Sequence, residues 1–375
     1  MKVSVSDSAL ATITDFSSGV RYRWCGCLPV GMRRVSVQSA GLMTLTLSLS
    51  ELSTSRGMVC VWAGTAAAPR QVHRTAANKR RGKFTQWLSS DSREVYRQAF
   101  INAPGARSAY IPYDPVMNLV EIAGTRLEVQ SIAGSAGLAP LVFLHEGLGS
   151  VSLWTQRGRS WPQAVCQATG RAGLVYSRRG YGQSDAVPDV RGAGRLAPDY
   201  MHREAWEVLP ALLASQGLAQ PVLLGHSDGA SIALLHASRH PVSAAIVMAP
   251  HLMVEDVAIQ AITQATAAFE SGALRVRLAR HHADVDCAFW QWNDVWLSPG
   301  FRSFDIRPDC RRIRAPLLAI QGLGDEYGTL AQLDELALAA PQTVQLRLPD
   351  CGHSPQRDQP DRTLEAIAGF LQPLR

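Results

Sequence analysis

From about residue 117 onward, short apolar runs alternate with amphipathic stretches along the chain. The runs are rich in Val, Leu and Ile, which predicts buried strands. In the stretches between most of them, apolar residues return every three or four positions, which predicts helices. Continuous apolar strands that alternate with helices are typical of a mainly parallel sheet with helices on both faces. The predicted strands are 140–144, 173–176, 221–224, 244–248, 316–320 and 343–348, and the predicted helices are 198–215, 230–240, 330–340 and 362–371.

The part of the chain before this repeat has a different pattern. Apolar residues alternate with polar ones on both sides of Gly124-Thr125, which predicts a hairpin over residues 119–130 with these two residues as its turn. Residues 1–116 show no strand–helix alternation, and within them residues 35–49 alternate apolar and polar side chains as a single strand does. We therefore expect the α/β domain to begin at the hairpin.

The charge of the protein is divided at the same place. Its net charge of +6 would by itself suggest an anionic partner such as nucleic acid. Residues 1–116 hold 15 Lys/Arg and 6 Asp/Glu, whereas residues 117–375 hold 22 and 25, so the basic character belongs to the first third of the chain. We expect that residues 1–116 are a poorly ordered basic extension, or that Met117 is the natural start. We interpret the basic cluster 78–83 as a solvated linker, with contact to nucleic acid as the weaker alternative, and we expect no nucleic-acid partner.

Composition excludes several classes of protein. Hydrophobic residues make up 46% of the chain and charged residues 18%, which favours a large core over a disordered chain. No run approaches ~18 apolar residues, and the N-terminus lacks a secretory pattern, so we expect neither a membrane partner nor export. The seven cysteines are odd in number and scattered, which favours a reducing compartment, and we expect a cytoplasmic protein.

A Gly-His-Ser-Asp-Gly sequence follows the predicted strand 221–224 and precedes the predicted helix 230–240. The glycines two residues either side of Ser227 let strand and helix approach closely, and such a tight turn holds a serine in a strained conformation at the sheet edge. A hydroxyl there lies near the positive N-terminus of the helix, but it needs a base that takes its proton. The sequence therefore predicts Ser227 as a nucleophile.

The base and its carboxylate partner are expected at the ends of later strands. His353 follows the last predicted strand in a loop before the final helix, whereas His281 and His282 fall in a polar segment away from any strand end. Asp325 follows the preceding strand, with Glu326 as the alternative one residue later. We expect Asp325 to orient His353 and His353 to take the proton of the serine.

The order Ser227, Asp325, His353 resembles that of the α/β-hydrolase fold superfamily, in its serine-nucleophile, carboxylesterase-like branch, and the resemblance covers essentially all of residues 117–375. Residues 178–184, Arg-Arg-Gly-Tyr-Gly-Gln-Ser, are similar to a structural turn of that superfamily. The resemblance implies an α/β-hydrolase fold with a helical cap inserted after the sixth strand, and hydrolysis through an acyl-enzyme with no metal and no cofactor. A serine in the turn between strand and helix argues against the haloalkane dehalogenase and epoxide hydrolase branches, which use an aspartate there.

The oxyanion of a tetrahedral intermediate needs hydrogen-bond donors. One is expected to be the backbone N–H of Asp228, directly after the serine, and the other to come from the loop 144–150. This loop resembles the His-Gly loop of the superfamily, except that Glu146 stands between the histidine and the glycine. We expect the second donor to be the N–H of Leu148, with that of Gly147 as the alternative. We expect Glu146 either to shape the loop or to act in catalysis.

Residues 251–310 separate two predicted strands and are expected to form the cap. Trp292 and Trp296 lie four positions apart, on one face of a helix, and either pack the cap or form an apolar wall over the serine. His251 stands at a strand end and either lines the pocket or is structural. The candidate pocket residues are His145, Glu146, His251, Trp292 and Trp296.

Together these residues predict a serine hydrolase that cleaves a small or medium carboxylic ester, with that small molecule as its partner. A thioesterase, a lactonase, a carbon–carbon hydrolase or an acyltransferase would use the same three residues. The alternative outside enzymes is a ligand-binding protein that keeps the fold without turnover. No pattern in the sequence indicates an oligomeric state.

Overall fold

The computed structural model describes residues 116–156 and 158–374, together with the backbone of five short strands nearer the N-terminus. The chain divides into two compact units, Met1–Ala109 and Tyr110–Arg375, which we treat separately. Two predictions concern residues outside the described part of the chain. They are that the extension 1–116 is poorly ordered and that the cluster 78–83 is a solvated linker.

The first unit contains short antiparallel strands. β3 (Arg34–Gln38) pairs with β4 (Thr44–Ser48) and with β1 (Lys2–Ser4), and β2 (Arg23–Cys25) pairs with β5 (Cys60–Trp62). The segment 35–49, predicted as one strand, therefore contributes to two strands that pair with each other. Alternation of apolar and polar residues indicates extended backbone, but it does not show where the chain reverses.

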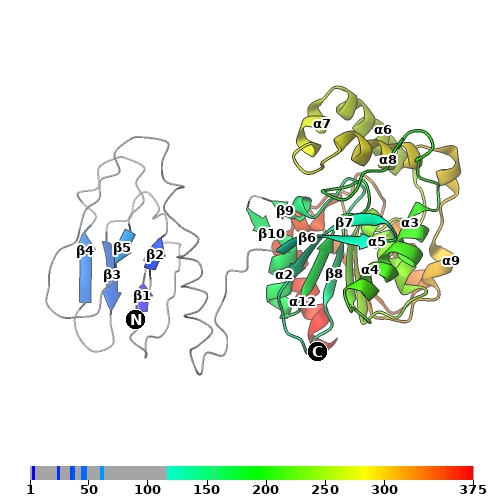
Figure 1. Cartoon of the computed structure of the whole chain (residues 1–375). Coiled ribbons are helices and arrows are strands. Elements are labelled where there is room, and N and C mark those ends of the chain that lie inside the picture. Colours follow the sequence, from blue (N-terminus) through cyan, green and yellow to red (C-terminus); the bar gives the residue numbers. More distant parts are fainter. Residues whose placement is uncertain are drawn as a thin grey trace. The chain divides into compact units, whose positions relative to one another are not determined.

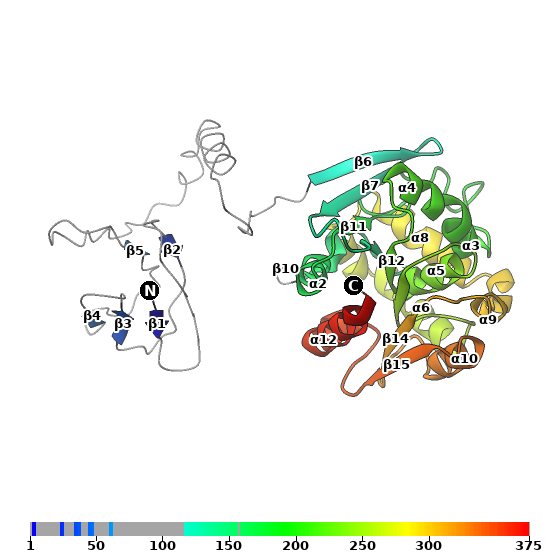
Figure 2. The ribbon, with the colours of Figure 1, turned by 90° about the horizontal axis from the view of Figure 1, so that it is seen from below.

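The second unit is built on one eight-stranded sheet (Figures 1 and 2). In chain order its strands are β6 (Val116–Ile122), β7 (Thr125–Ile132), β8 (Leu141–Leu144), β11 (Gly173–Tyr176), β12 (Val222–His226), β13 (Ala244–Met248), β14 (Leu317–Gly322) and β15 (Thr343–Leu348). Their order across the sheet is β15-β14-β13-β12-β8-β11-β7-β6. The strands from β15 to β11 are parallel, and β7 and β6 add an antiparallel edge. The predicted mainly parallel α/β fold is confirmed.

The hairpin β6–β7 turns one residue earlier than predicted. Ile122 pairs with Thr125, so the turn consists of Ala123 and Gly124, whose φ angles are 49° and 76°. Two left-handed residues are typical of a type I′ turn, whose twist matches that of the flanking strands. The predicted turn Gly124-Thr125 is wrong because the β-branched Thr125 is favoured in a strand, while Ala123 takes the left-handed position.

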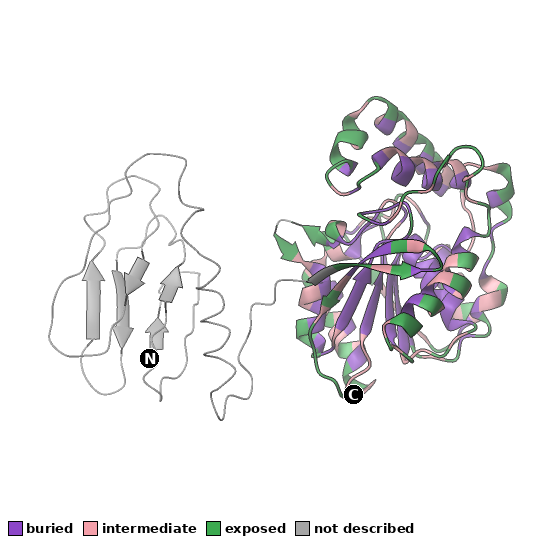
Figure 3. Ribbon diagram, in the orientation of Figure 1, coloured by how far each residue is buried: buried purple, intermediate pink, exposed green. Residues whose placement is uncertain are grey.

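Helices cover both faces of the sheet. They are α2 (Trp161–Thr169), α3 (Tyr200–Arg203), α4 (Leu209–Ser215), α5 (Asp228–Ala237), α10 (Ala331–Ala339), α11 (Pro355–Asp358) and α12 (Pro360–Leu371). Because successive residues of a strand face opposite sides, Val142 and Leu144 of β8 belong to one core and Leu141 and Phe143 to another. The first core includes residues of α3, α4, α5 and α10, and the second includes residues of α2 and α12. Figure 3 shows the strands between them buried.

Several predicted boundaries shift. The predicted helix 198–215 begins at Tyr200 and contains a π-helical turn over Glu204–Val208 between α3 and α4. The strands β12 and β14 extend two residues beyond their predicted ends, to His226 and Gly322. Histidine and glycine do not continue an apolar run, so the pattern of hydrophobic residues ends before the hydrogen-bonded pairing of the strands does.

A helical insertion follows β13, the sixth strand of the sheet in chain order. It contains α6 (Asp256–Glu270), α7 (Ala273–Leu278), α8 (Val285–Trp296) and α9 (Arg307–Cys310). The rings of Phe269 and Phe289 stack with centroids 3.8 Å apart and join α6 to α8. Figure 1 shows α6, α7 and α8 gathered beyond one end of the strands. This insertion occupies the position predicted for the cap, and we call it the cap.

Within the part of the chain that the structure describes, no helix combines the length and apolar character needed to cross a membrane. Four described cysteines, Cys166, Cys287, Cys310 and Cys351, are free and buried. Thiols in such positions pack as small apolar groups.

Candidate active site

Ser227 lies in the sharp turn between β12 and α5, with a φ angle of 55°. A non-glycine residue in this left-handed region carries backbone strain, which occurs mostly at functional sites. A Cβ on Gly225 would lie 2.2 Å from the carbonyl O of Gly229, and a Cβ on Gly229 would lie 2.1 Å from the carbonyl O of Leu144. Glycine at both positions therefore lets α5 begin directly against β12 and beside the end of β8.

The side chains of Ser227, His353 and Asp325 meet in one hydrogen-bonded chain. Nε2 of His353 is 2.9 Å from Oγ of Ser227, and Nδ1 of His353 is 2.8 Å from Oδ1 of Asp325. Because an ionised carboxylate only accepts hydrogen bonds, Nδ1 donates to it, and Nε2 is left to accept the hydroxyl proton. Ser227 is 7% exposed and His353 5%, so the chain lies in a nearly closed site.

Asp325, rather than its neighbour Glu326, contacts the imidazole. Oδ1 of Asp325 also accepts from the N–H of Tyr327 at 2.9 Å, and Oδ2 accepts from Nε2 of Gln321 at 3.0 Å. Although burial favours the neutral acid, the hydrogen bond to His353 and the charge of that ring hold the pKa of Asp325 below its usual value. Glu326 instead accepts the backbone N–H of His353 at 3.1 Å, so it holds the loop and not the ring.

The pKa of the His353 imidazole is raised above its usual value of 6.5. Burial acts against the protonated ring, but the hydrogen bond to Asp325 and the negative charges of Asp325, Glu146 and Glu326 outweigh it. A raised pKa gives the unprotonated imidazole a stronger tendency to take a proton. The surroundings of His353 therefore suit general-base chemistry.

The backbone of His353 is held independently of its ring. Nε2 of His226, the residue before the serine, donates to the carbonyl O of His353 at 2.7 Å. Nδ1 of His226 then accepts from Nε2 of Gln356 at 3.1 Å. Burial lowers the pKa of His226, which favours its neutral form. His226 thus ties the turn of the serine to the loop of His353, a contact that the sequence analysis missed.

The loop after β8 forms a turn next to the start of α5. The N–H of Gly149 donates to the carbonyl O of Glu146 at 3.1 Å, so Gly147 and Leu148 form the corner of the turn. A Cβ on Gly229 would lie 2.6 Å from the carbonyl O of residue 145, which shows how closely the two segments approach. Among the described residues, neither the N–H of Gly147 nor that of Leu148 has a backbone acceptor. Both candidates for the second oxyanion donor are therefore available.

His145 and His282 both hold this loop through hydrogen bonds to its carbonyl groups. Nδ1 of the buried His145 donates to the carbonyl O of Glu146 at 2.7 Å, and its Nε2 accepts from the N–H of Arg178 at 3.0 Å. Nε2 of His282 donates to the carbonyl O of Leu148 at 3.1 Å, and its Nδ1 accepts a backbone N–H from the loop after β11 at 3.0 Å. His145 therefore shapes the loop instead of offering its ring to a ligand. His282, set aside in the sequence as distant from any strand end, contacts two strand-end loops.

Glu146 brings a carboxylate to the site. Its side chain is 36% exposed, and its Oε2 lies 3.6 Å from Nδ1 of His226. In the described part of the chain, this carboxylate forms no ion pair with an arginine. The nearby imidazole of His226 is neutral, and the guanidinium of Arg357, which hydrogen-bonds Asp358, lies close enough to interact with the charge of Glu146 without forming an ion pair with it.

The two tryptophans of α8 occupy different places. Trp296 is 1% exposed, and its Nε1 donates to the hydroxyl of Tyr200 at 3.0 Å, so it packs the cap onto the rest of the domain. Trp292 lies against the turn after β8, because a Cβ on Gly147 would lie 2.2 Å from its Nε1. Of the two rings predicted as an apolar wall, Trp292 borders the turn and Trp296 lies in the core.

Two further rings border the imidazole of His353. The ring centroid of His251 is 5.7 Å away and that of Tyr327 is 4.7 Å away. Burial is the main cause that lowers the pKa of His251 to about 3, and the charge of His353 adds to it. His251 therefore stays neutral. Tyr327 was missed in the sequence, although it follows the predicted acid by two residues. Inspection of the immediate neighbours of each predicted residue would have found Tyr327 and His226, but no local signal marks His282.

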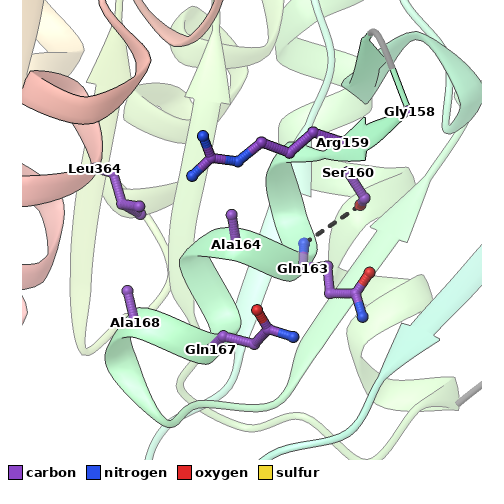
Figure 4. A pocket seen from close by; sticks show the side chains of 8 residues that line it. All are labelled: Gly158, Arg159, Ser160, Gln163, Ala164, Gln167, Ala168 and Leu364. Carbon is purple, nitrogen blue, oxygen red and sulfur yellow. Dashed lines mark hydrogen bonds between the residues drawn. The ribbon is translucent and has the colours of Figure 1, made fainter. Parts of the chain in front are cut away.

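A surface pocket of about 570 Å³ lies elsewhere, along α2 (Figure 4). It is lined by Gly158, Arg159, Ser160, Gln163, Ala164, Gln167, Ala168 and Leu364. The N–H of Gln163 donates to Oγ of Ser160 at 3.4 Å, which caps α2 at its N-terminus. None of the candidate site residues lines this pocket, so we assign it no part in the chemistry of the serine.

A mainly parallel sheet of this order, with a strained serine between a strand and a helix, defines the α/β-hydrolase fold. The chain matches the Alpha/beta hydrolase family over residues 141–366. It belongs to that family, and it is a hydrolase.

The chain is similar to a curated protein and to proteins of known structure. The chain is 25% identical over 274 residues to the sn-1-specific diacylglycerol lipase ABHD11 of Mus musculus. The alignment covers 65% of this chain and 85% of the lipase. The structure of a membrane phospholipase A, a bacterial virulence factor, superposes with a TM-score of 0.56 at 16% identity, covering 70% of this chain and 87% of that one. The enol-lactonase of Burkholderia xenovorans LB400 superposes with a TM-score of 0.54 at 21% identity, covering 68% and 100%. At these identities, the structural likeness shows the fold alone.

Proposed function

We propose that the chain is a serine hydrolase that cleaves a small or medium, uncharged carboxylic ester through an acyl-enzyme. The observation that carries this proposal is the hydrogen-bonded chain from Ser227 through His353 to Asp325, with contacts of 2.9 and 2.8 Å. A nucleophile within hydrogen-bond reach of a base, and a third group that orients the base, is the arrangement that activates a serine.

In the first half of the reaction, Oγ of Ser227 attacks the ester carbonyl carbon while Nε2 of His353 takes the hydroxyl proton. The backbone N–H of Asp228 and a free amide of the turn after β8, that of Leu148 or its neighbour, stabilise the oxyanion. The imidazolium, stabilised by Asp325, then gives its proton to the departing alcohol. The acyl group is left as an ester of the serine.

In the second half, the same imidazole takes a proton from a water molecule, whose oxygen attacks the acyl carbon. The second tetrahedral intermediate uses the same oxyanion donors, since its oxygen occupies the same position. As it collapses, the proton returns to Oγ of Ser227, and the carboxylic acid leaves. The enzyme is restored without any change of oxidation state.

The charge of Glu146 supports an uncharged substrate. Its carboxylate contributes to the field at His353 and forms no ion pair with an arginine among the described residues, so we expect a second negative charge on an acyl group to be repelled. For the same reason the anionic product would leave readily. We therefore propose neutral esters ahead of hemiesters of dicarboxylic acids.

The names of similar proteins support oxygen esters as the substrate class. One relative is named a diacylglycerol lipase and one structural neighbour an enol-lactonase, and both names describe cleavage of an ester bond to oxygen. Thioesters, carbon–carbon bonds and acyl transfer would involve the same three residues. A panel of substrates distinguishes these reactions, since they differ in the leaving group and in the acyl acceptor.

The proposed nucleophile is tested with a fluorophosphonate, which phosphonylates an activated serine. We expect intact protein to gain one adduct on Ser227 and Ser227→Ala to gain none. Hydrolysis of p-nitrophenyl esters of increasing acyl length, with aryl esters alongside, should be lost in the same variant. An equal adduct on Ser227→Ala, or binding of esters without any turnover by the unchanged protein, would reject the proposal and favour a ligand-binding protein.

A further inference from the structure

Arg178 is a charged side chain buried behind the turn that carries the serine. It follows β11, in the segment that the sequence analysis interpreted as a structural turn, and it is 4% exposed. Its Nη1 donates to the carbonyl O of His145 at 2.9 Å, and its Nη2 donates to the carbonyl O of Glu146 at 3.0 Å. Its backbone N–H donates to Nε2 of His145 at 3.0 Å. One residue therefore holds the start of the loop after β8 with three directed hydrogen bonds.

The hydrogen bond to Glu146 fixes the direction of the amides that follow. In a planar trans peptide, the C=O of Glu146 and the N–H of Gly147 point in opposite directions. The bond from the N–H of Gly149 to Glu146 closes a turn in which neither Gly147 nor Leu148 has a positive φ, as in a type I turn. Both central residues of such a turn are right-handed, so the two N–H groups point the same way, as at the start of a helix. Both free amides therefore point away from Arg178.

The same guanidinium faces the turn that carries the serine. Nη2 of Arg178 lies 3.9 Å from Oδ2 of Asp228, and the hydroxyl of Tyr200 donates to this oxygen at 2.5 Å. Nε1 of Trp296 in the cap donates to the Tyr200 hydroxyl at 3.0 Å. Asp228 supplies the other amide proposed for the oxyanion. Arg178 thus adjoins both halves of the proposed oxyanion hole, one through backbone carbonyls and the other through a carboxylate.

These contacts call for a charged and forked side chain. Lysine concentrates its charge on one nitrogen and does not reproduce two parallel donors in a fixed geometry. A neutral side chain would leave the carbonyl O of His145 without this donor and the buried carboxylate of Asp228 without the cation that faces it. Arginine meets all of these requirements at once.

We propose that Arg178 is a positioning residue for oxyanion stabilisation: its hydrogen bonds set the orientation of the turn 146–149 relative to Asp228, and with it the spacing of the two sets of donors. Arg178 contacts neither the substrate nor the reacting atoms. The proposal rests on the proposed hydrolase function, because it concerns the transition state of that reaction.

The test compares Arg178→Lys and Arg178→Met with the unchanged enzyme on a neutral p-nitrophenyl ester. A displaced donor weakens binding of the transition state and not of the substrate, so we expect kcat to fall about 10- to 100-fold with little change in KM. Arg179→Lys and Arg179→Met are the matched controls, because Arg179 is the exposed neighbour. Their kcat should stay near that of the unchanged enzyme.

Two further measurements separate positioning from a loss of folding. Titration with a fluorophosphonate to its end point counts the competent sites, so kcat is expressed per competent site even where a variant folds poorly. The rate of phosphonylation should fall together with kcat, because the phosphoryl oxygen uses the same donors. The acid limb of the pH profile of kcat/KM should not move, because Arg178 makes no contact with His353 or Asp325 among the described hydrogen bonds.

The proposal is overturned if kcat per titrated site in both Arg178 variants matches that of the Arg179 variants, or if the loss lies in KM alone. It is also overturned if the acid limb moves with kcat, because the variants would then act through the base. A failure of the hydrolase mechanism gives a different result. In that case the unchanged protein does not react with the fluorophosphonate, or Ser227→Ala reacts equally.

Discussion

The two sides of Ser227 are built in different ways. On what we call the base side, Asp325 and His353 extend from the loops after β14 and β15, and their side chains form a short chain of hydrogen bonds. On what we call the amide side, the turn 146–149 presents backbone N–H groups, and side chains such as Arg178 and those of α8 only hold it in place. The base side is defined by side-chain chemistry and the amide side by backbone conformation.

This difference determines how each side responds to change. A base needs an imidazole, and few other side chains replace it, so a substitution on the base side removes the chemistry. Every residue except proline has an N–H, so a substitution on the amide side displaces a donor that remains present. We therefore expect losses of activity to be larger on the base side.

Removal of the base should have the largest effect. His353→Ala is expected to lower kcat by about 10⁶-fold, because the serine then has no base and members of such a chain act as a unit. The measurement is kcat for a p-nitrophenyl ester, with thermal unfolding as the control for folding. Activity near that of the unchanged enzyme would show that a different group activates the serine.

The choice between the two neighbouring acids gives the next largest effect. Asp325→Asn should lower kcat by about 10⁴-fold, because an amide does not stabilise the imidazolium and favours the wrong tautomer. Glu326→Gln is its matched control and should lower kcat far less, since the hydrogen bond of Glu326 goes to the backbone of His353 and not to its ring. Equal losses in the two variants would contradict the assignment of Asp325.

On the amide side, Gly147→Ala should lower kcat by about 10²-fold. The added Cβ would lie 2.2 Å from Nε1 of Trp292, so the turn has to move, and small displacements at a reacting centre are costly. Gly137→Ala is the control, because its Cβ would meet nothing closer than 4.0 Å. The double variant with Trp292→Leu should recover part of the activity. Lower activity in the double variant than in Gly147→Ala would refute the steric explanation.

The smallest effect is expected where the two sides meet, at Glu146. Its negative charge favours the protonated imidazole and so raises the pKa of His353, and Glu146→Gln should therefore lower that pKa. Since the base acts unprotonated, the acid limb of the pH profile of kcat/KM should move to lower pH. The ratio of kcat/KM for hemiesters of dicarboxylic acids to kcat/KM for neutral esters should rise. Glu207→Gln, at a side chain that is 66% exposed, is the control. An acid limb that moves to higher pH would contradict this account.

The base side could be predicted from the sequence more completely than the amide side. Strands appear as apolar runs, and the loops that follow them are short, so Ser227, Asp325 and His353 could be selected by residue type and position. The contacts of the amide side join segments far apart: Arg178 lies 33 and 32 residues from the carbonyls that it holds, and His282 lies 134 residues from Leu148. Hydrophobic periodicity indicates which face of an element is buried, but it does not show which polar atoms meet there.

The fold could be predicted in outline for a related reason. Six parallel strands and the insertion after β13 follow from apolar runs and the lengths between them. The turn of the hairpin could not be placed, because Ala123 adopts a conformation that its residue type does not favour. Local exceptions of this kind depend on the register of the neighbouring strand.

The hydrogen bond from His226 to the carbonyl O of His353 joins the segment of the nucleophile to the segment of the base without using either reactive side chain. The geometry of the loops and the chemistry that they carry are therefore held by different atoms. We therefore expect a substitution of Ser227 or His353 to remove the proposed chemistry and to leave this link in place, because the link uses the ring of His226 and a backbone oxygen. The arrangement of the loops and the reactivity of the site can therefore be altered independently of each other by substitution.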